Sequence, residues 1–338
     1  MNRCSTRWLA CITALVSLSS ISPLVAQQKG QWEPGQMGLN AGIMPDAGIS
    51  YINIDLNYSA STLNNASGSA TRVTGNYNVW VVENIFYYVP KFKVLGGNLG
   101  FMIAQPTVAN GSLVIDLGQP PIFSATGLGG YGFADTYVQP VTLGWHLPRA
   151  DVWIGYAFFA PTGRYTPGAT NNIGSGYLGN DFVTGSTLYL TKNKATSLSL
   201  FTNLESHGSK QGANNTSLTP GGTWTDEWGL GQVVPLKKDF SRLLQVGLVG
   251  YDQLQVTANG GSLPPGMGLI PANRLPFYSV HSAGIQSNFI LPKKNLAFNF
   301  KYYWEYSSKA HPLGDTLVFG LSWTFRIPKP PPPTPPKS

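Results

Sequence analysis

The sequence predicts an all-β protein, a transmembrane antiparallel up-and-down β-barrel of about 12 strands with short periplasmic turns and long extracellular loops. Three observations predict it: scarce charge, alternating apolar and polar residues, and alternating short and long connections. Only 11% of the 338 residues are charged and 42% are hydrophobic, whereas a soluble domain carries about 25% charged residues. This composition argues against an ordinary cytosolic enzyme, a coiled coil and a charge-rich disordered chain.

Residues 1–26 are predicted to be a secretory signal peptide. A basic start is followed by an apolar stretch over 8–20 and by Ala26, a small residue that suits the position before cleavage. A buried N-terminal helix is the weaker alternative. Cys4 and Cys11 would leave with the signal, so the mature chain would hold no disulfide and no cysteine-based metal site. The net charge of +7 includes no basic cluster of the kind that binds nucleic acid.

Period-2 alternation recurs along the mature chain. It is clearest over 296–306, where the even positions are large and apolar or aromatic, and the odd positions include polar and charged residues. No later segment has the run of about 18 apolar residues that a membrane helix needs, but barrels cross with segments of about 10 alternating residues. The predicted strands are 48–59, 72–89, 93–106, 131–147, 151–160, 178–191, 195–206, 222–236, 241–257, 276–291, 295–306 and 315–327. Their even number places both termini on the short-turn side.

Short and long connections alternate between these strands. Short turns are predicted at 91–93, 147–150, 192–194, 237–239 and 292–295, and long loops near 60–70, 107–130, 161–177, 207–221, 258–275 and 307–314. Lysines and arginines gather at the short turns, since a cation on the lipid face costs about 2–4 kcal/mol at the membrane midplane. The predicted interface aromatics are Tyr87, Tyr88, Trp145, Tyr189, Trp304, Tyr306, Trp323 and Phe325.

The barrel is predicted to occupy residues 48–327, with one further segment on each side. Residues 27–47 are glycine- and proline-containing, and are either a periplasmic lead-in or a plug that folds into the barrel. Residues 328–338 form a Pro-rich tail that is predicted to be disordered.

Two stretches carry a family resemblance. The first is Gly38-Leu39-Asn40-Ala41-Gly42 with Met44, Pro45 and Gly48, and the second runs from Phe133 to Pro140 and on to 160–165. They resemble the phenol-degradation MetA-pathway family over about residues 35–327. The resemblance implies an outer-membrane β-barrel that serves as a channel for aromatic or other hydrophobic compounds, and it supplies no catalytic residues.

The polar partners of the apolar strand faces are expected to line the lumen. The main candidates for a substrate path are Asp55, Trp153, Phe159, Phe201, Asn203, Glu205, Tyr251, Asn299, Lys301, Tyr303 and Glu305, with Asn53, Asn57, Ser199, Gln245 and Gln253 beside them. The alternative is that these side chains fill the barrel, with Lys301 neutralised by Glu305 or Glu205. Asp135, Arg164 and Tyr165 are either residues of the loop mouth or a salt bridge and loop clamp.

No catalytic, cofactor or metal motif is evident. The four histidines lack metal-ligand spacing, and the Ser279–His281 pair, on one strand face, has no acyl-hydrolase motif around it. We therefore expect a non-enzymatic outer-membrane channel whose partners are membrane lipid, the barrel-assembly machinery and small hydrophobic solutes. The alternatives are a structural or adhesive barrel, a lipid-modifying enzyme and a secreted β-sandwich. The sequence predicts no particular substrate or oligomeric state.

Overall fold

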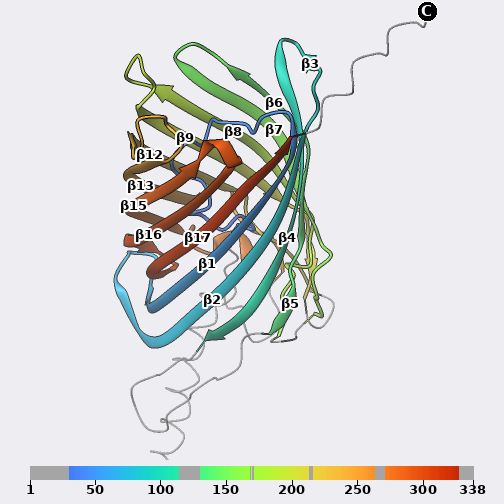
Figure 1. Ribbon diagram of the computed structural model, residues 1–338. Helices are drawn as coiled ribbons and strands as arrows, with labels where there is room; N and C mark the ends of the chain where they lie inside the picture. Colours follow the sequence, from blue (N-terminus) through green and yellow to red (C-terminus); the bar gives the residue numbers. More distant parts are fainter. Residues whose placement is uncertain are drawn as a thin grey trace, which may run out of the picture.

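The fold is a closed antiparallel β-barrel, as predicted. The computed structural model describes residues 30–113, 130–167, 169, 171–212, 216–262 and 271–326. Twelve long strands form its wall, and β2 pairs with both β1 and β4, so that the sheet closes on itself (Figure 1). The predicted signal peptide and Pro-rich tail lie outside the described residues.

The wall strands follow one another in sequence order around the barrel. They are β1 (Gly48–Asn64), β2 (Ala70–Val89), β4 (Gly97–Leu113), β6 (Thr136–His146), β7 (Ala150–Ala160), β8 (Gly179–Tyr189), β9 (Thr196–His207), β12 (Thr223–Pro235), β13 (Leu243–Gln255), β15 (Ser279–Leu291), β16 (Leu296–Lys309) and β17 (Pro312–Arg326). The first and last strands pair from Gly48 opposite Arg326, which leaves no free sheet edge.

Smaller elements lie in the connections. They are β3 (Lys93–Val94), β5 (Tyr131–Phe133), β10 (Lys210–Gln211), β11 (Ser217–Thr219), β14 (Gly260–Gly261) and the 3-10 turns η2 (Ala272–Arg274) and η3 (Pro292–Lys294). Strand β11 pairs with β10 on one side and β14 on the other, which joins two long loops at one end of the barrel.

Two predicted long loops are wrong. β1 and β2 are joined by residues 65–69 alone, and β16 and β17 by Ala310 and His311. Ala310 has a positive φ of 46°, as a tight turn requires. Both hairpins extend past the predicted loop positions because their Ser, Thr, Asn and Gly residues pair as strands beyond the apolar part of the wall.

The outer face of the wall is largely apolar. Side chains such as Ile154, Leu200, Leu248, Ile285 and Phe319 are exposed there, while their strand neighbours are buried inside. Of the predicted interface aromatics, Tyr87 and Tyr189 instead point into the barrel and are buried. No helix within the described ranges is long and apolar enough to cross a membrane.

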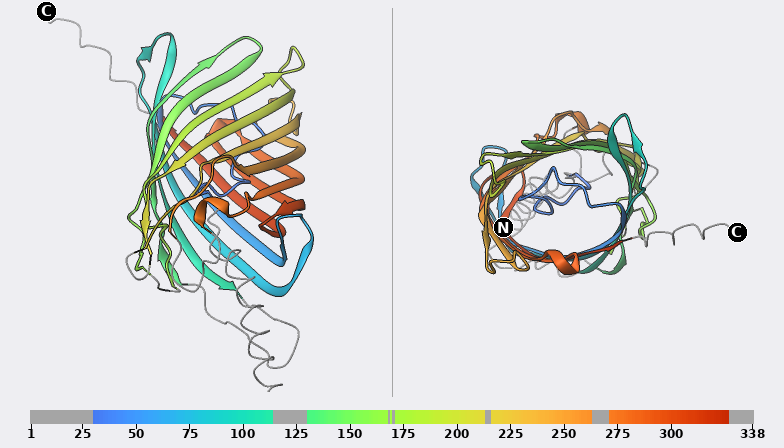
Figure 2. Two further views of the ribbon diagram at one scale, coloured as in Figure 1. Left: turned by 180° about the vertical axis from the view of Figure 1, so that it is seen from behind. Right: turned by 45° about the horizontal axis from the view of Figure 1, so that its top comes forward.

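Residues 30–47, called the lumen segment below, run through the barrel interior without adding a strand to the wall (Figure 2). The amide N–H of Gly30 donates to Tyr278 at the long-loop end, and Gly42 donates to Thr187 near the short-turn end, where β1 then begins. The prediction that both ends of the barrel lie on the short-turn side is therefore confirmed for the start of β1 and the end of β17, while the lumen segment reaches β1 from the long-loop end.

Candidate functional site

Two buried carboxylates hold the first half of the lumen segment. Glu205 accepts the amide N–H groups of Gln31 at 2.6 Å and Trp32 at 3.2 Å. Glu227 accepts the Trp32 indole N–H at 2.9 Å and the amide of Met37 at 2.8 Å. A chain without strand partners must find acceptors for its N–H groups inside the barrel, and these carboxylates supply them.

Lys301 holds the same stretch from its carbonyl side. Its ammonium group donates to the carbonyl oxygens of Gly35, at 3.0 Å, Gln36 and Met37. Within the described residues it is the one buried lysine or arginine. The alternative in which Glu305 or Glu205 neutralises Lys301 is wrong, because the carboxylate that attracts Lys301 is Glu227, on β12.

Amide and hydroxyl side chains hold the second half. Leu39 donates to Gln286, Asn40 to Ser199 and Gln245, and Gly42 to Thr187, while the Trp153 indole donates to the carbonyl of Ala41 at 2.7 Å. The wall carries glycine where the segment approaches it. A Cβ atom at Gly229 or Gly231 would lie 2.9 or 2.8 Å from the Leu39 side chain.

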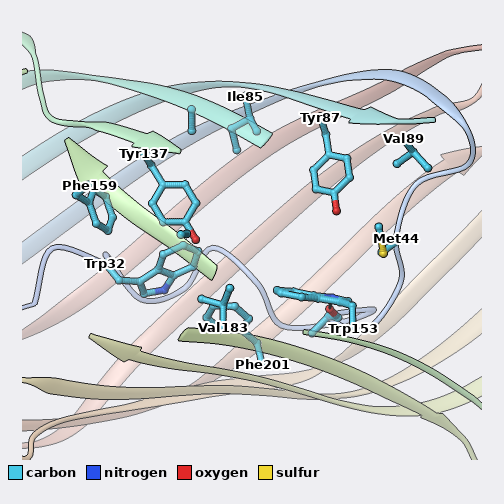
Figure 3. Packing of buried hydrophobic residues seen from close by; sticks show 13 residues of the cluster. Trp32, Met44, Ile85, Tyr87, Val89, Tyr137, Trp153, Phe159, Val183 and Phe201 are labelled. Atoms are coloured by element: carbon cyan, nitrogen blue, oxygen red, sulfur yellow. Dashed lines mark hydrogen bonds between the residues drawn. The ribbon is translucent and has the colours of Figure 1, made fainter. Parts of the chain in front are cut away.

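Aromatic packing adds to these hydrogen bonds. Trp32 of the lumen segment packs on Phe201, with ring centroids 4.9 Å apart, and edge-on against Tyr137 at 5.8 Å (Figure 3). Phe159 lies 4.8 Å from Tyr137, and Met44 joins the same buried cluster near Trp153. The interior is therefore an aromatic core shared between wall and segment.

A small pocket remains between the lumen segment and the wall, nearer the long-loop end, and its volume of about 10 Å³ is room for about one water molecule. Glu33 and Pro34 of the segment line one side, and the opposite side has Leu56, Tyr58, Tyr251, Gln253, Val280, Glu305, His311 and Thr316. Glu305 is fixed by hydrogen bonds from the Tyr58 and Tyr251 hydroxyls, both at 2.9 Å, and from the Gly314 amide at 2.6 Å. The pocket thus joins apolar surfaces to an oriented carboxylate, and it is far smaller than the pockets that hold small-molecule ligands.

The structure places most of the predicted lumen residues inside. Trp153, Phe159, Phe201, Asn203, Glu205, Tyr251, Lys301, Tyr303, Glu305, Ser199, Gln245 and Gln253 are buried there, and the Asn299 amide oxygen is buried beside Gly320. Together they surround the lumen segment.

The prediction is wrong for β1, where Asp55, Asn53 and Asn57 point outward. Their apolar neighbours Leu56 and Tyr58 are buried in the interior cluster instead. The outward amides hydrogen-bond to asparagines of β2, and Asp55 accepts the indole N–H of exposed Trp80 at 3.4 Å. The inward and outward faces of β1 are reversed for a physical reason: the interior beside β1 is filled with protein, so apolar side chains are as favourable there as they are against lipid.

The three residues predicted at the loop mouth have different roles: Asp135 holds a loop in place, and Arg164 and Tyr165 lie in that loop. Asp135 is buried and accepts the amides of Gly163 and Ser175 at 3.0 and 2.7 Å. Arg164 is exposed and donates to the Asn171 carbonyl, and Tyr165 donates to the Gln211 carbonyl. Asp135 therefore acts as a loop clamp, without an ion pair to Arg164 among the described residues.

Sequence reasoning missed several interior acids. Glu83, Asp151, Asp181 and Glu227 are all buried. The signal was present for Glu227, since Thr223, Thr225 and Glu227 share one face of β12. Within the described part of the chain, no cluster of three or more His, Cys, Asp or Glu side chains is arranged to hold a metal ion.

These features define a class: an outer-membrane-type β-barrel whose interior is occupied by its own N-terminal segment. The chain belongs to the family described as "Putative MetA-pathway of phenol degradation", whose model matches residues 60–321. No curated protein matches the sequence.

The chain is similar to several solved structures, and the first of those named below shares its fold. The COG4313 outer membrane channel from Pseudomonas putida F1 superposes with a TM-score of 0.67 at 12% identity, over 87% of this chain and all of that one. The β domain of the Bordetella autotransporter BrkA gives a TM-score of 0.46 at 9% identity, over 83% of this chain and 100% of that one. The TodX monoaromatic hydrocarbon channel, as a deletion mutant, gives 0.39 at 8% identity, over 86% and 93%.

Proposed function

We propose that the protein is an outer-membrane channel through which small hydrophobic or aromatic compounds diffuse, with the short turns in the periplasm. The signal peptide would direct export, and the barrel-assembly machinery would insert the chain. The observation that carries the proposal is the lumen segment, an irregular chain inside a closed barrel, with a small pocket beside it that is lined by Leu56, Tyr58, Tyr251 and Glu305. The family's description as part of phenol degradation supports the choice of solute.

In this proposal the lumen segment is the gate. The pocket beside Glu33 and Pro34 is too small for an aromatic solute, so a solute that enters from the long-loop end passes only if the segment shifts. The segment is suited to shifting because it adds no strand to the sheet and is held at separate points, chiefly Glu205, Glu227 and Lys301.

A second candidate function is a structural or adhesive barrel that transports nothing. The filled interior favours it, because Trp32, Leu39 and Met44 are buried as core residues are. A lipid-modifying enzyme has weaker support. On the outer face His281 pairs with Asp252 at 2.6 Å, and within the described residues no serine hydrogen-bonds to His281.

Uptake measured with the segment free and tethered separates these candidates. Asn40 and Gln245, whose side chains exchange hydrogen bonds of 2.7 and 2.9 Å, would be replaced by cysteines and joined by a short bifunctional thiol reagent. The protein would be placed in vesicles with a lipopolysaccharide outer leaflet, and entry of labelled phenol would be followed against protein-free vesicles. The control is the same double variant with each thiol capped separately.

A channel gated by the segment predicts uptake above the protein-free rate for the capped protein and loss of that excess when the segment is tethered. Uptake equal to protein-free vesicles, both for the native chain and after deletion of residues 30–47, would refute the channel and favour the structural barrel. Equal uptake by tethered and capped protein would refute gating alone.

A further inference from the structure

Three buried oxygen atoms near the start of the lumen segment have no hydrogen-bond donor. They are Oε1 of Gln31, Oδ1 of Asp181 and Oδ1 of Asn203. The Asn203 amide donates to the other oxygen of Asp181 at 3.2 Å, which links β9 to β8. Gln31 Oε1 lies against Gly179, on the same face of β8 as Asp181, so closely that a Cβ there would clash with it.

The amide orientations are fixed, so these atoms are truly acceptors. The Gln31 NH₂ group donates to the Asp135 carboxylate at 3.3 Å and to the Tyr177 carbonyl at 3.5 Å. Turning the amide would set its oxygen against both acceptors, and turning Asn203 would set its oxygen against Asp181. All three atoms therefore require a donor or a cation as partner.

The local charge points to a cation. Asp181 and Glu205 lie directly opposite one another on β8 and β9, with exposed fractions of 0% and 2%. Like charges in directly opposed positions destabilise a sheet. His207, 2.9 Å from Glu205, is the basic side chain in contact with this pair, whereas Lys301 is engaged by Gly35, Gln36 and Met37.

We propose that Asp181, Asn203, Gln31 and Glu205 form a binding site for a hard divalent cation, with Ca²⁺ as the best match. Carboxylate and carboxamide oxygens are the ligands that Ca²⁺ prefers, and a carboxylate that already accepts hydrogen bonds keeps lone pairs for a metal. The site combines two carboxylates with two carboxamides. Because Gln31 belongs to the lumen segment and the other three to the wall, a bound cation ties the start of the segment to β8 and β9.

Calcium binding to the whole mature protein tests the proposal. The detergent-solubilised protein would be stripped with EDTA, and titration calorimetry and the unfolding temperature would be followed as Ca²⁺ or Mg²⁺ is added. We expect one saturable Ca²⁺ site per chain and a higher unfolding temperature. Asp181→Asn should weaken the affinity by about tenfold or more, since affinity follows ligand charge. The matched control is Asp252→Asn, at a partly exposed carboxylate that pairs with His281 on the outer face.

A second variant guards against misfolding of the first. Asn203→Asp adds a charged oxygen at the site and should bind Ca²⁺ more tightly than the native chain. The proposal is overturned if no saturable binding is found, or if Asp181→Asn and Asp252→Asn bind Ca²⁺ equally. An unfolding temperature that responds to pH and not to Ca²⁺ would also overturn it, because a shared proton would then complete the site. None of these outcomes depends on uptake, so they leave the proposed channel untouched.

Discussion

Replacing Lys301 by methionine is the sharpest test of how the lumen segment is held. The substitution keeps an unbranched apolar chain of similar length and removes the ammonium group. Three segment carbonyls, those of Gly35, Gln36 and Met37, lose their donor, and Glu227 loses its attracting cation. The wall itself stays intact, because the backbone of Lys301 pairs with β15 and β17 as before.

The expected cost follows from these contacts. Hydrogen bonds to a charged group contribute about 1.5–3 kcal/mol each, and three of them do not add fully. We therefore take about 3–5 kcal/mol, less than the sum of three such bonds, for the loss of docking free energy. Each 1.4 kcal/mol changes an equilibrium constant about tenfold, so the population of molecules with a released lumen segment should rise by about 10²- to 10⁴-fold.

Thiol labelling measures that population. Cysteine would be placed at Gln36, in a mature chain that is predicted to lack cysteine, and its reaction with a maleimide would be timed. Lys293→Met is the control, because Lys293 pairs with Asp239 at 2.7 Å on the exposed short turns. A labelling rate that rises less than about threefold, a change worth under 1 kcal/mol, would refute the reasoning and show that packing holds the segment.

The same labelling assay applies to Trp32→Ala, which removes the contacts of Trp32 with Phe201 and Glu227. This substitution should weaken docking of the lumen segment by about 3–5 kcal/mol and so raise the labelling rate. A labelling rate equal to that of the native chain would show that Trp32 does not hold the segment. Leu200→Arg puts a cation on the outer face and should destabilise the barrel in lipid vesicles by about 2–4 kcal/mol. Urea titration measures this change, and a stability equal to that of the native chain would contradict a lipid-facing Leu200. Desolvation of the half-buried Lys210 lowers its pKa to about 8 from 10.5, so the unfolded loop binds more protons than the folded loop between these values. The β10–β11 hairpin should therefore become more stable as pH rises through that window. Hydrogen exchange measures this rise, and its persistence in Lys210→Gln would assign it to another group.

The strands could be predicted because period-2 alternation and basic short turns are local signals. The segment over 296–306 became β16 with the expected faces, since Lys301, Tyr303 and Glu305 are buried inside. Strand length was less predictable. Residues 307–314 are as polar as a loop, but the hairpin of β16 and β17 continues through them because paired backbone needs no apolar side chains once it leaves the lipid.

The inward face of β1 and the path of the lumen segment could not be predicted from the local sequence pattern. Alternation in 48–59 separates two faces without saying which is inside, and the choice depended on apolar partners such as Val81 and Tyr303. The segment has no periodicity, and its contacts join residues as far apart in sequence as Trp32 and Glu227. The sequence predicted many of the polar wall residues that hold the lumen segment, but it did not predict that the segment itself is their partner.

The interior acids have a structural reason to exist apart from any solute. An irregular chain inside a barrel cannot give its N–H groups to strand neighbours, so it needs side-chain acceptors. Glu205 and Glu227 accept segment amides, while Asp135 and Glu305 accept loop amides. Substitution of Glu205 or Glu227 should therefore alter the position of the segment before it alters selectivity. Glu305 differs, because its carboxylate also faces the pocket, so in the proposed channel its substitution should alter solute uptake as well as loop structure.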